Sequence, residues 1–221
     1  MTLWVIKGGG NIVLFDSGFY RDKFFKSWTV KDFMRPSDAL ADLGIKPEDV
    51  TDLVISHIHW DHADGADLFP KARVWIQRDE YMHYVGDAWQ KRGRGEGADP
   101  DDVLALVKIN EHGRLSFVEG DSQQILPGIS CYIGGKHTFQ SQYLGVNTRK
   151  GTVILASDNV YLFENLEKHV PIAQTLDAKS NLAAQGRMKT LASRPALIIP
   201  GHDPKVFTLF PKISSRVVRI D

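Results

Sequence analysis

Four metal-capable side chains fall within residues 57–62 of this sequence, in the order His57, His59, Asp61 and His62. Neutral imidazoles and carboxylates are the ligands that zinc and similar divalent ions prefer. Three histidines and an acid at this spacing argue against the alternative of a polar turn whose histidines are merely solvated. Because six residues cannot complete two metal sites alone, the motif predicts further ligands elsewhere in the chain.

Three more residues share the position of this motif, close behind an apolar run that is typical of a strand. They are His137, Asp158 and His202. Strand ends carry function because the sheet fixes the backbone while the following loop directs side chains into a cleft. Each of these residues alone could be an ordinary polar residue. If the strand ends converge, five histidines and two aspartates suffice for two adjacent metals that share one carboxylate.

The remaining histidines and the cysteine receive no chemical role. His83, His112 and His169 lie in helical or turn contexts without a preceding strand, so we predict ordinary surface histidines. Cys131 is the single cysteine of the chain. A lone cysteine excludes an intramolecular disulfide and a thiolate-rich structural zinc site.

The elements that position these residues are predicted from apolar periodicity and turn residues. Strands are predicted over residues 3–6, 11–15, 52–56, 72–77, 115–118, 129–133, 143–147, 152–156, 196–199 and 206–210. Helices are predicted over residues 37–43, with Ser37 as N-cap and Gly44 as the stop, and over 78–89, 100–110 and 179–192. This alternation in two successive blocks, without a linker, predicts an α/β fold with two packed sheets and helices on the outside. Residues 1–221 are expected to form a single domain.

Two segments each allow two interpretations. Residues 19–35 are dense in aromatic side chains that alternate with charged ones. A segment packed on the core is the favoured interpretation, and a partly mobile wall over an apolar substrate pocket is the functional one. Residues 91–99 form a charged, glycine-rich stretch. We expect a solvated surface loop there, with a lid over the cleft as the alternative.

The composition indicates a globular protein with a small-molecule partner. Of 221 residues, 43% are hydrophobic and 24% are charged, and 27 basic residues balance 27 acidic ones. No global field therefore favours nucleic acid or an anionic membrane. Residues 1–7 lack the features of a signal peptide, and no apolar stretch approaches membrane-spanning length, so the cytoplasm is the expected location.

From Asp16 to His202 the sequence resembles the metallo-β-lactamase-fold hydrolases. Their pattern is Asp-x-Gly at a strand end, then His-x-His-x-Asp-His, then a histidine, a bridging aspartate and a final histidine. The matching positions here are Asp16-Ser17-Gly18, His57, His59, Asp61, His62, His137, Asp158 and His202. The resemblance implies a metallo-β-lactamase-like αββα sandwich with two divalent ions, zinc being the first expectation and iron, manganese or cobalt the alternatives. It also implies that His57, His59 and His137 hold one ion, that Asp61, His62 and His202 hold the other, and that Asp158 bridges them.

Within this family the sequence is similar to the N-acyl-homoserine lactonases, the quorum-quenching branch. Asp158 argues against true β-lactamases, which lack a bridging aspartate there, and His59 argues against the diiron redox branch, which carries glutamate. Tyr161 matches a tyrosine that points at the substrate carbonyl or ring oxygen in the lactonases, although a tyrosine packed at a strand end is the alternative. Phe139 and Gln140 replace a Pro-Gly pair common in the family, and they are expected to reshape the pocket floor.

The expected mechanism uses a hydroxide that bridges the two metals and attacks a lactone or ester carbonyl. Asp61 would orient the hydroxide, Asp158 would help move a proton to the leaving alkoxide, and Tyr161 would donate a hydrogen bond to the carbonyl oxygen. Asp16 and Asp64 are expected to accept ring N–H bonds from ligand histidines.

The expected substrate is a small lactone or ester with an apolar part, which would contact aromatic residues of 19–34 together with Trp60 and Phe139. The family is compatible with a homodimer. Two alternatives stay open. One is a thioester hydrolase that resembles glyoxalase II; such enzymes normally add a basic C-terminal helical region, which the residues after His202 do not match. The other is a non-catalytic metal-binding module of the same fold, which would usually have lost some ligands.

Overall fold

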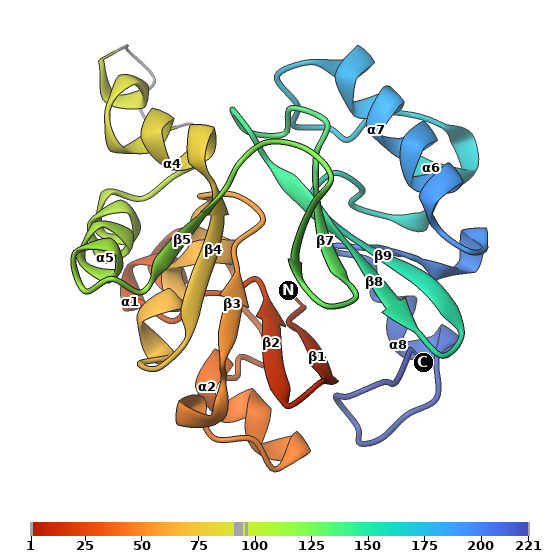
Figure 1. Cartoon of the computed structure of the whole chain (residues 1–221), viewed down its shortest axis with the longest axis horizontal. Coiled ribbons are helices and arrows are strands. Elements are labelled where there is room, and N and C mark those ends of the chain that lie inside the picture. The colour runs from red at the N-terminus through yellow and green to blue at the C-terminus, as the bar shows by residue number, and fades with distance from the viewer. Residues whose placement is uncertain (1, 91–94, 96, 221) are drawn as a thin grey trace. The chain divides into compact units, whose positions relative to one another are not determined.

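The computed structural model describes residues 2–90, 95 and 97–220. The chain divides into two compact units, Met1–Phe117 and Val118–Asp221, called unit 1 and unit 2 below. Each unit carries one five-stranded mixed sheet with helices (Figure 1). The predicted two sheets with helices are therefore confirmed. A single domain over residues 1–221 stays a prediction.

The sheet of unit 1 has the strand order β1-β2-β3-β4-β5. Its strands are β1 (Trp4–Gly8), β2 (Asn11–Phe15), β3 (Asp52–Val54), β4 (Arg73–Gln77) and β5 (Leu115–Val118), the last residue of which already belongs to unit 2. The two predicted strands β1 and β2 form an antiparallel hairpin, whereas β2, β3 and β4 run parallel. All three residues of β3 are buried, because the strand lies inside the sheet. The carboxyl ends of β2 and β3 therefore meet at one edge of the sheet.

Short helices surround this sheet. They are α1 (Asp22–Ser27), α2 (Pro36–Ala39), α3 (Trp60–Ala63), α4 (Arg78–Val85) and α5 (Pro100–Glu111), with the 3₁₀ turns η1 (Leu40–Leu43), η2 (Pro47–Asp49), η3 (Asp64–Leu68) and η4 (Asp87–Trp89). Helix α5 begins as its sequence predicts, because Asp99 accepts a hydrogen bond from the Asp101 amide at 2.9 Å and Pro100 occupies the first turn. Fully buried Ile55, Phe69 and Leu106 join strands and helices in one apolar core.

The sheet of unit 2 has the order β10-β9-β8-β7-β6. Its strands are β6 (Gln123–Leu126), β7 (Ile129–Ile133), β8 (Gln142–Thr148), β9 (Gly151–Ser157) and β10 (Ile198–Pro200). Strands β6 to β9 are antiparallel neighbours, and β10 is parallel to β9. The helical elements are α6 (Phe163–Lys168), α7 (Ala178–Leu191), η5 (Pro195–Leu197) and α8 (Val206–Leu209). Buried Tyr143, Ile154 and Met188 join this sheet to α7.

Several predicted elements differ from the structure. The strand predicted over 206–210 is wrong, because Val206–Leu209 is the short helix α8. Its apolar, β-branched composition suggested a strand, but Asp203 accepts a hydrogen bond from the Lys205 amide at 2.9 Å and starts a helical turn, in which Val206 is the buried residue. The edge strand β6 and the helix α6 were not predicted. In β6 the first two residues are exposed glutamines, so the strand lacks an alternating apolar pattern.

Smaller differences concern helix ends and one loop. The helix predicted from Ser37 begins at Pro36, and Arg35 is its N-cap without a side-chain hydrogen bond. Gly44 ends the following 3₁₀ turn in a left-handed conformation, as predicted. The helix predicted over 78–89 is interrupted at Gly86. Of the charged loop predicted over 91–99, residues 91–94 and 96 lie outside the described residues.

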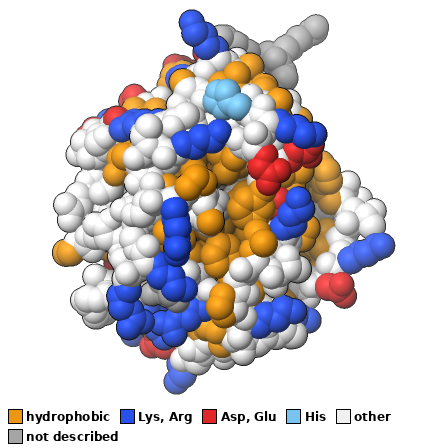
Figure 2. All heavy atoms as spheres, turned by 90° about the vertical axis from the view of Figure 1, so that its right-hand side faces the viewer, with side chains coloured by type: hydrophobic (Ala, Val, Ile, Leu, Met, Phe, Trp, Pro, Cys, Tyr) orange, Lys and Arg blue, Asp and Glu red, His pale blue; other side chains and the backbone are white. Residues whose placement is uncertain are grey.

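The surface of the described residues is uneven in character. Figure 2 shows hydrophobic side chains gathered at the middle of one face, with lysine and arginine side chains and some acidic ones around them. Within the described residues, no helix is both long enough and apolar enough to cross a membrane.

Candidate metal centre

The seven predicted ligands divide between the units, with four in unit 1 and three in unit 2. In unit 1, the parallel pairing of β2 with β3 places Asp16 beside the start of the histidine motif, because both follow strand ends at the same sheet edge. The Asp16 amide donates to the Val54 carbonyl at 2.8 Å, and the Ser17 amide donates to the His62 carbonyl at 2.8 Å. Backbone hydrogen bonds therefore hold the motif against the Asp16 turn.

Asp16 also engages the motif through its side chain, as predicted. Oδ2 lies 2.8 Å from Nδ1 of His62, and Oδ1 accepts a hydrogen bond from the Ser56 amide at 2.8 Å. The carboxylate is buried, and its residue adopts a left-handed backbone with φ of 64°. Such a conformation costs free energy in a non-glycine residue and persists where the surroundings hold it in place. One carboxylate thus orients the His62 ring and the backbone before His57.

The imidazoles of unit 1 lie close together. The His57 ring centroid is 4.6 Å from that of His59 and 4.2 Å from that of His62. Ligand atoms of His57 and His59 lie within 4.8 Å of each other, and the same holds for Asp61 and His62. Nδ1 of His57 is 2.7 Å from Oγ of Ser56. A ring bonded through Nδ1 coordinates a metal through Nε2, so both His57 and His62 are oriented to bind through Nε2.

The three predicted ligands of unit 2 follow from its topology. Asp158 and His202 come after the parallel strands β9 and β10, so they leave the sheet at the same edge. His137 lies in the loop between β7 and β8, and this loop reaches the same edge because β8 is antiparallel to β9. The predicted convergence of strand ends is therefore confirmed within this unit.

Asp158 lies between two imidazoles. Its Oδ2 is 3.3 Å from Nε2 of His137, and its Oδ1 is 2.6 Å from Nε2 of His202. Gly201 permits this approach, because a Cβ atom there would lie 2.8 Å from the Ser157 carbonyl and 3.1 Å from Oδ1 of Asp158. Each oxygen of one carboxylate thus faces a different imidazole, which is the arrangement that a carboxylate shared by two ions requires.

Backbone groups orient the rings of unit 2. Nδ1 of His137 lies 2.7 Å from the Gln174 carbonyl oxygen, so this ring too is oriented to coordinate through Nε2. The His202 amide donates to the Tyr161 carbonyl at 3.1 Å. The half-buried Tyr161 ring lies between the two imidazoles, with centroids 5.8 Å from His137 and 5.6 Å from His202. Tyr161 therefore lies beside two of the predicted ligands and is partly open to solvent.

Asp64 does not orient a histidine, contrary to the prediction. Its carboxylate accepts hydrogen bonds from the Tyr20 and Arg21 amides and pairs with the Arg21 guanidinium. Arg21 also pairs with Asp102 at 2.7 Å, and both carboxylates are fully buried. Burial raises the pKa of Asp102 to about 9, and the neighbouring Asp64 adds to this effect. This group therefore attaches the segment before α1 to η3 and α5.

The predicted aromatic segment forms a cluster that includes a residue of the metal motif. Its members are Phe19, Phe24, Phe25, Trp28, Phe33 and Trp60. Trp60 stacks on Phe24 with centroids 4.5 Å apart and on Trp28 at 5.8 Å. Phe24 is buried, whereas Trp28 is 57% exposed. The segment therefore packs on the core with one side and offers aromatic surface beside the motif with the other.

The described end of the 91–99 loop also contacts the motif. The Gly97 carbonyl accepts a hydrogen bond from the Trp60 amide at 3.2 Å. A Cβ atom on Gly97 would lie 2.8 Å from Nε2 of His59. At this end the segment therefore contacts the histidine motif and is not only a solvated loop.

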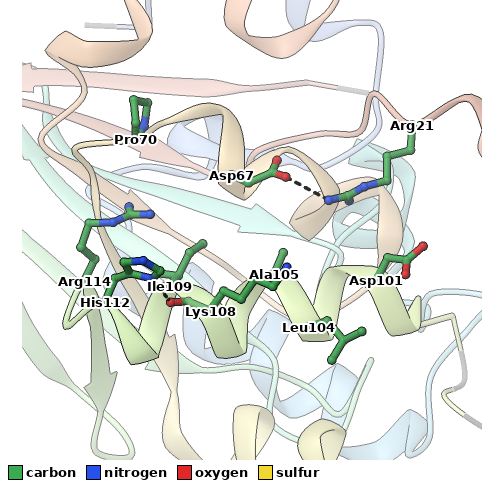
Figure 3. Close-up of a pocket in the computed structure, with 10 residues that line it drawn as sticks. All are labelled: Arg21, Asp67, Pro70, Asp101, Leu104, Ala105, Lys108, Ile109, His112 and Arg114. Atoms are coloured by element: carbon green, nitrogen blue, oxygen red, sulfur yellow. Dashed lines mark hydrogen bonds and ion pairs between the residues drawn. The ribbon is translucent and has the colours of Figure 1, made fainter.

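A cavity of about 490 Å³ lies elsewhere in unit 1, between α5, η3 and the start of β5 (Figure 3). Its lining consists of Arg21, Asp67, Pro70, Asp101, Leu104, Ala105, Lys108, Ile109, His112 and Arg114. None of the seven predicted ligands belongs to it. Arg21 pairs with Asp67 across the edge of this cavity at 3.0 Å, and the lining also carries the acidic Asp101 and the basic Lys108 and Arg114.

Three orienting groups were not predicted: Ser56, Glu80 and the Gln174 carbonyl. Glu80 is fully buried and accepts a hydrogen bond from the Ile58 amide at 3.0 Å. A hydroxyl directly before the first histidine was a readable signal for Ser56. A backbone carbonyl 37 residues from its partner leaves no such signal in the sequence.

Comparisons with known proteins identify the family to which this chain belongs. The family model described as the metallo-beta-lactamase superfamily matches residues 2–202. An N-acyl homoserine lactonase of Bacillus cereus is 29% identical over 192 residues, which cover 86% of this chain and 70% of that protein. The lactonase AttM of Azorhizobium caulinodans is 29% identical over 185 residues, covering 77% of this chain and 64% of that protein.

Solved structures give the same result. A crystal structure of a Bacillus thuringiensis AiiA variant with N-decanoyl-L-homoserine bound at its active site has a TM-score of 0.72 and 25% identity, covering 92% of this chain and 81% of that one. An N-acyl homoserine lactone hydrolase with the product N-hexanoyl-L-homoserine at its catalytic metal centre has a TM-score of 0.71 and 25% identity, covering 91% and 80%. The predicted αββα fold class is thereby confirmed. The chain belongs to the metallo-β-lactamase superfamily and is a metal-dependent hydrolase.

Proposed function

We propose that this chain is an N-acyl-homoserine lactonase that opens the lactone ring at a centre of two divalent metal ions. The carboxylate of Asp158 carries the proposal, since its two oxygens lie 3.3 and 2.6 Å from the Nε2 atoms of two different histidines. The names of the relatives from Bacillus and Azorhizobium support the substrate class.

The donor set fits such a centre. Five imidazoles and two carboxylates suit zinc first, and they also accept iron, manganese or cobalt. Three imidazoles bond through Nδ1 to Ser56, Asp16 or the Gln174 carbonyl, as metal-binding histidines commonly do. A structural neighbour at 16% identity, with a TM-score of 0.70 over 91% of this chain and 72% of that one, is described as a dizinc lactonase. We therefore assign two zinc ions.

We assign three residues to each ion and a seventh residue to both ions. His57, His59 and His137 would hold one ion, Asp61, His62 and His202 the other, and Asp158 both. When bound, the ions supply Lewis acidity, which activates water as the nucleophile and polarises the lactone carbonyl.

Three side chains would perform the proton transfer and orientation steps. Asp61 accepts a hydrogen bond from the attacking water and orients it toward the carbonyl carbon. Tyr161 donates its hydroxyl proton in a hydrogen bond to the carbonyl or ring oxygen, where negative charge develops. Asp158 accepts the proton of the nucleophile and passes it to the leaving alkoxide, so that the ring opens to a hydroxy acid.

The apolar part of the substrate would contact the aromatic cluster. Trp60 belongs both to the motif and to this cluster, so an acyl chain along Trp28 and Phe33 would begin next to the metal ligands. Phe139 is 39% exposed in the loop that carries His137 and offers a further apolar surface.

Metal removal combined with one substitution tests this function. We expect protein loaded with zinc to release acid from N-acyl-homoserine lactones, to lose this activity on chelation, and to regain it when zinc is restored. Asp61→Asn should reduce kcat by about 100-fold or more, because the neutral amide no longer orients the water nucleophile. Activity would be followed by acid release, and metal content by elemental analysis.

Two outcomes would contradict the proposal. Full activity after complete metal removal would exclude a metal-dependent mechanism. Turnover of acyl thioesters without any lactone hydrolysis would instead indicate a thioester hydrolase.

A further inference from the structure

Asn159 directly follows Asp158 and is 1% exposed. Its side chain makes four hydrogen bonds inside unit 2. Oδ1 accepts from the Gly135 amide at 2.6 Å and from Oγ of Ser141 at 3.3 Å. Nδ2 donates to the Ala156 carbonyl at 3.0 Å and to the Gln142 carbonyl at 3.5 Å. The acceptor and both donors of one amide group are thus all in use.

These partners are the two ends of the loop that carries His137. Gly135 lies two residues before His137, and Ser141 with Gln142 lies after it at the start of β8. The Gly134 amide donates to the Ser141 carbonyl at 2.7 Å, which closes the loop at its base. A buried amide next to Asp158 therefore ties both ends of this loop to the β9 turn.

The contact between the loop and the Asn159 amide leaves no space for a side chain at Gly134. A Cβ atom on Gly134 would lie 2.1 Å from Oδ1 of Asn159, so the loop backbone packs directly on the amide. Lys136 and Ser157, the residues before His137 and Asp158, have left-handed φ values of 55° and 47°. Such conformations persist only where the surroundings hold them. The Asn159 amide supplies part of that support at both turns.

We propose that Asn159 is a positioning residue, whose amide sets the separation of His137 from Asp158 and so prepares these two side chains to share a metal ion. This inference rests on the proposed metal centre. Only a neutral amide presents an acceptor to Gly135 and Ser141 together with donors to two carbonyl groups. A carboxylate would place an oxygen against the Ala156 and Gln142 carbonyls, which repel it, and the loop would shift.

The test compares two amide-to-carboxylate substitutions at equally buried positions. Asn159→Asp changes the loop contact. Gln185→Glu is the matched control, because Gln185 is 0% exposed in α7 and donates to the Val170 carbonyl at 2.9 Å and to Oδ1 of Asn181 at 3.0 Å. Its hydrogen bonds reach Asn159 only through Asn181, which donates to the Asn159 carbonyl and not to its side chain. Both variants should lower the melting temperature of the metal-free protein. Only Asn159→Asp should weaken Co²⁺ binding, by about tenfold or more, and change the visible absorption spectrum of the bound cobalt.

Ser141→Ala provides a milder variant, which removes one hydrogen bond to Oδ1 of Asn159. We expect a smaller loss of Co²⁺ affinity in the same direction, and this variant decides the matter if Asn159→Asp does not fold. The role of Asn159 would be overturned if folded Asn159→Asp and Ser141→Ala proteins kept the wild-type Co²⁺ affinity and cobalt spectrum. It would also be overturned if Gln185→Glu lost as much Co²⁺ affinity as Asn159→Asp. Wild-type protein that bound no Co²⁺ or Zn²⁺ would overturn the proposed metal centre as well, which separates the two failures.

Discussion

At the scale of single residues, hydrogen bonds to ring nitrogens select the atom through which each histidine can coordinate. The Nδ1 atoms of three predicted ligands have partners at 2.7 to 2.8 Å, namely Ser56 for His57, Asp16 for His62 and the Gln174 carbonyl for His137. A ring held in this way needs little reorganisation when a metal binds through Nε2, so we expect these partners to contribute to the affinity of the proposed metal centre.

Asp16→Asn tests that contribution. The neutral amide is a weaker acceptor for the His62 ring N–H than the carboxylate, so zinc affinity should fall by roughly 10- to 100-fold. Competition with a chromophoric chelator would measure it. Asp52→Asn is the control, since Asp52 is also buried in unit 1 but bonds to Nε1 of Trp75 at 2.8 Å instead of to a ligand. Equal zinc affinities of both variants would contradict the orienting role of Asp16.

Tyr161→Phe removes a single hydroxyl from a ring that lies beside the imidazoles of two proposed ligands, His137 and His202. Loss of one hydrogen-bond donor to developing negative charge should lower kcat by about 10- to 100-fold with unchanged zinc content. Steady-state kinetics on a short-chain lactone would measure it. A variant with wild-type kcat would favour the alternative of a tyrosine that merely packs at the strand end.

At the scale of elements, α1 and α5 of unit 1 are joined through charges. Arg21, just before α1, pairs with Asp64 of η3 and with Asp102 of α5, and Lys23 of α1 pairs with Asp99 and Asp101. The pairs hold the aromatic cluster on the core. They also hold Asp102 and Asp64 close together in a buried place, so burial and the neighbouring Asp64 raise the pKa of Asp102, while the Arg21 guanidinium opposes this shift.

This raised pKa predicts a pH dependence of stability. The folded state holds the Asp102 proton more tightly than the unfolded state, so the stabilisation is complete below the ordinary aspartate range and is lost as the pH rises toward about 9. The free energy of unfolding should therefore fall between pH 6 and pH 9, and it should fall less steeply in Asp102→Asn. Urea unfolding at several pH values measures both slopes.

Asp101→Asn is the matched control for this experiment. Asp101 is the exposed neighbour in α5, and its hydrogen bond with Lys23 lowers its pKa, so it does not titrate between pH 6 and pH 9. The control should follow the wild-type slope. Identical slopes for wild type and Asp102→Asn would show that Asp102 is ionised throughout this range in the folded protein.

At the scale of the whole molecule, the proposed centre takes four ligands from unit 1 and three from unit 2. Metal binding should therefore stabilise the entire chain against unfolding. At a free zinc concentration 1,000 times Kd the gain is about 4 kcal/mol, which corresponds to a rise in Tm of roughly 8–16 °C for a chain of this size. Differential scanning calorimetry with and without zinc measures the shift.

The double variant His57→Ala with His202→Ala is the control for that measurement, because it removes one proposed ligand from each unit. It should show little or no zinc-dependent rise in Tm. A wild-type Tm independent of zinc, at concentrations where zinc binding is demonstrated, would contradict a centre built from both units.

Much of this arrangement follows from local properties of the sequence. Ligand chemistry is carried by residue type, and strand ends are marked by short apolar runs, so the sequence by itself identifies His57 to His62, His137, Asp158 and His202 as candidate ligands. The hairpin β1–β2, the strand β9 and the helices α5 and α7 follow from periodicity and caps in the same way. The short helix α8 was predicted wrongly as a strand, because its apolar composition is typical of strands. The hydrogen bond between Asp203 and the Lys205 amide instead starts a helical turn there.

The partners of the ligands depended on the folded chain. His62 meets Asp16 across 46 residues, His137 meets Gln174 across 37, and Asn159 meets Gly135 across 24, because strand order and direction bring these segments together. The same topology directs Asp64 to Arg21 instead of to a histidine. Residue types and spacing therefore specified the metal chemistry, whereas sheet topology selected which groups orient it, since hydrogen bonds act over about 3 Å in space regardless of separation along the chain.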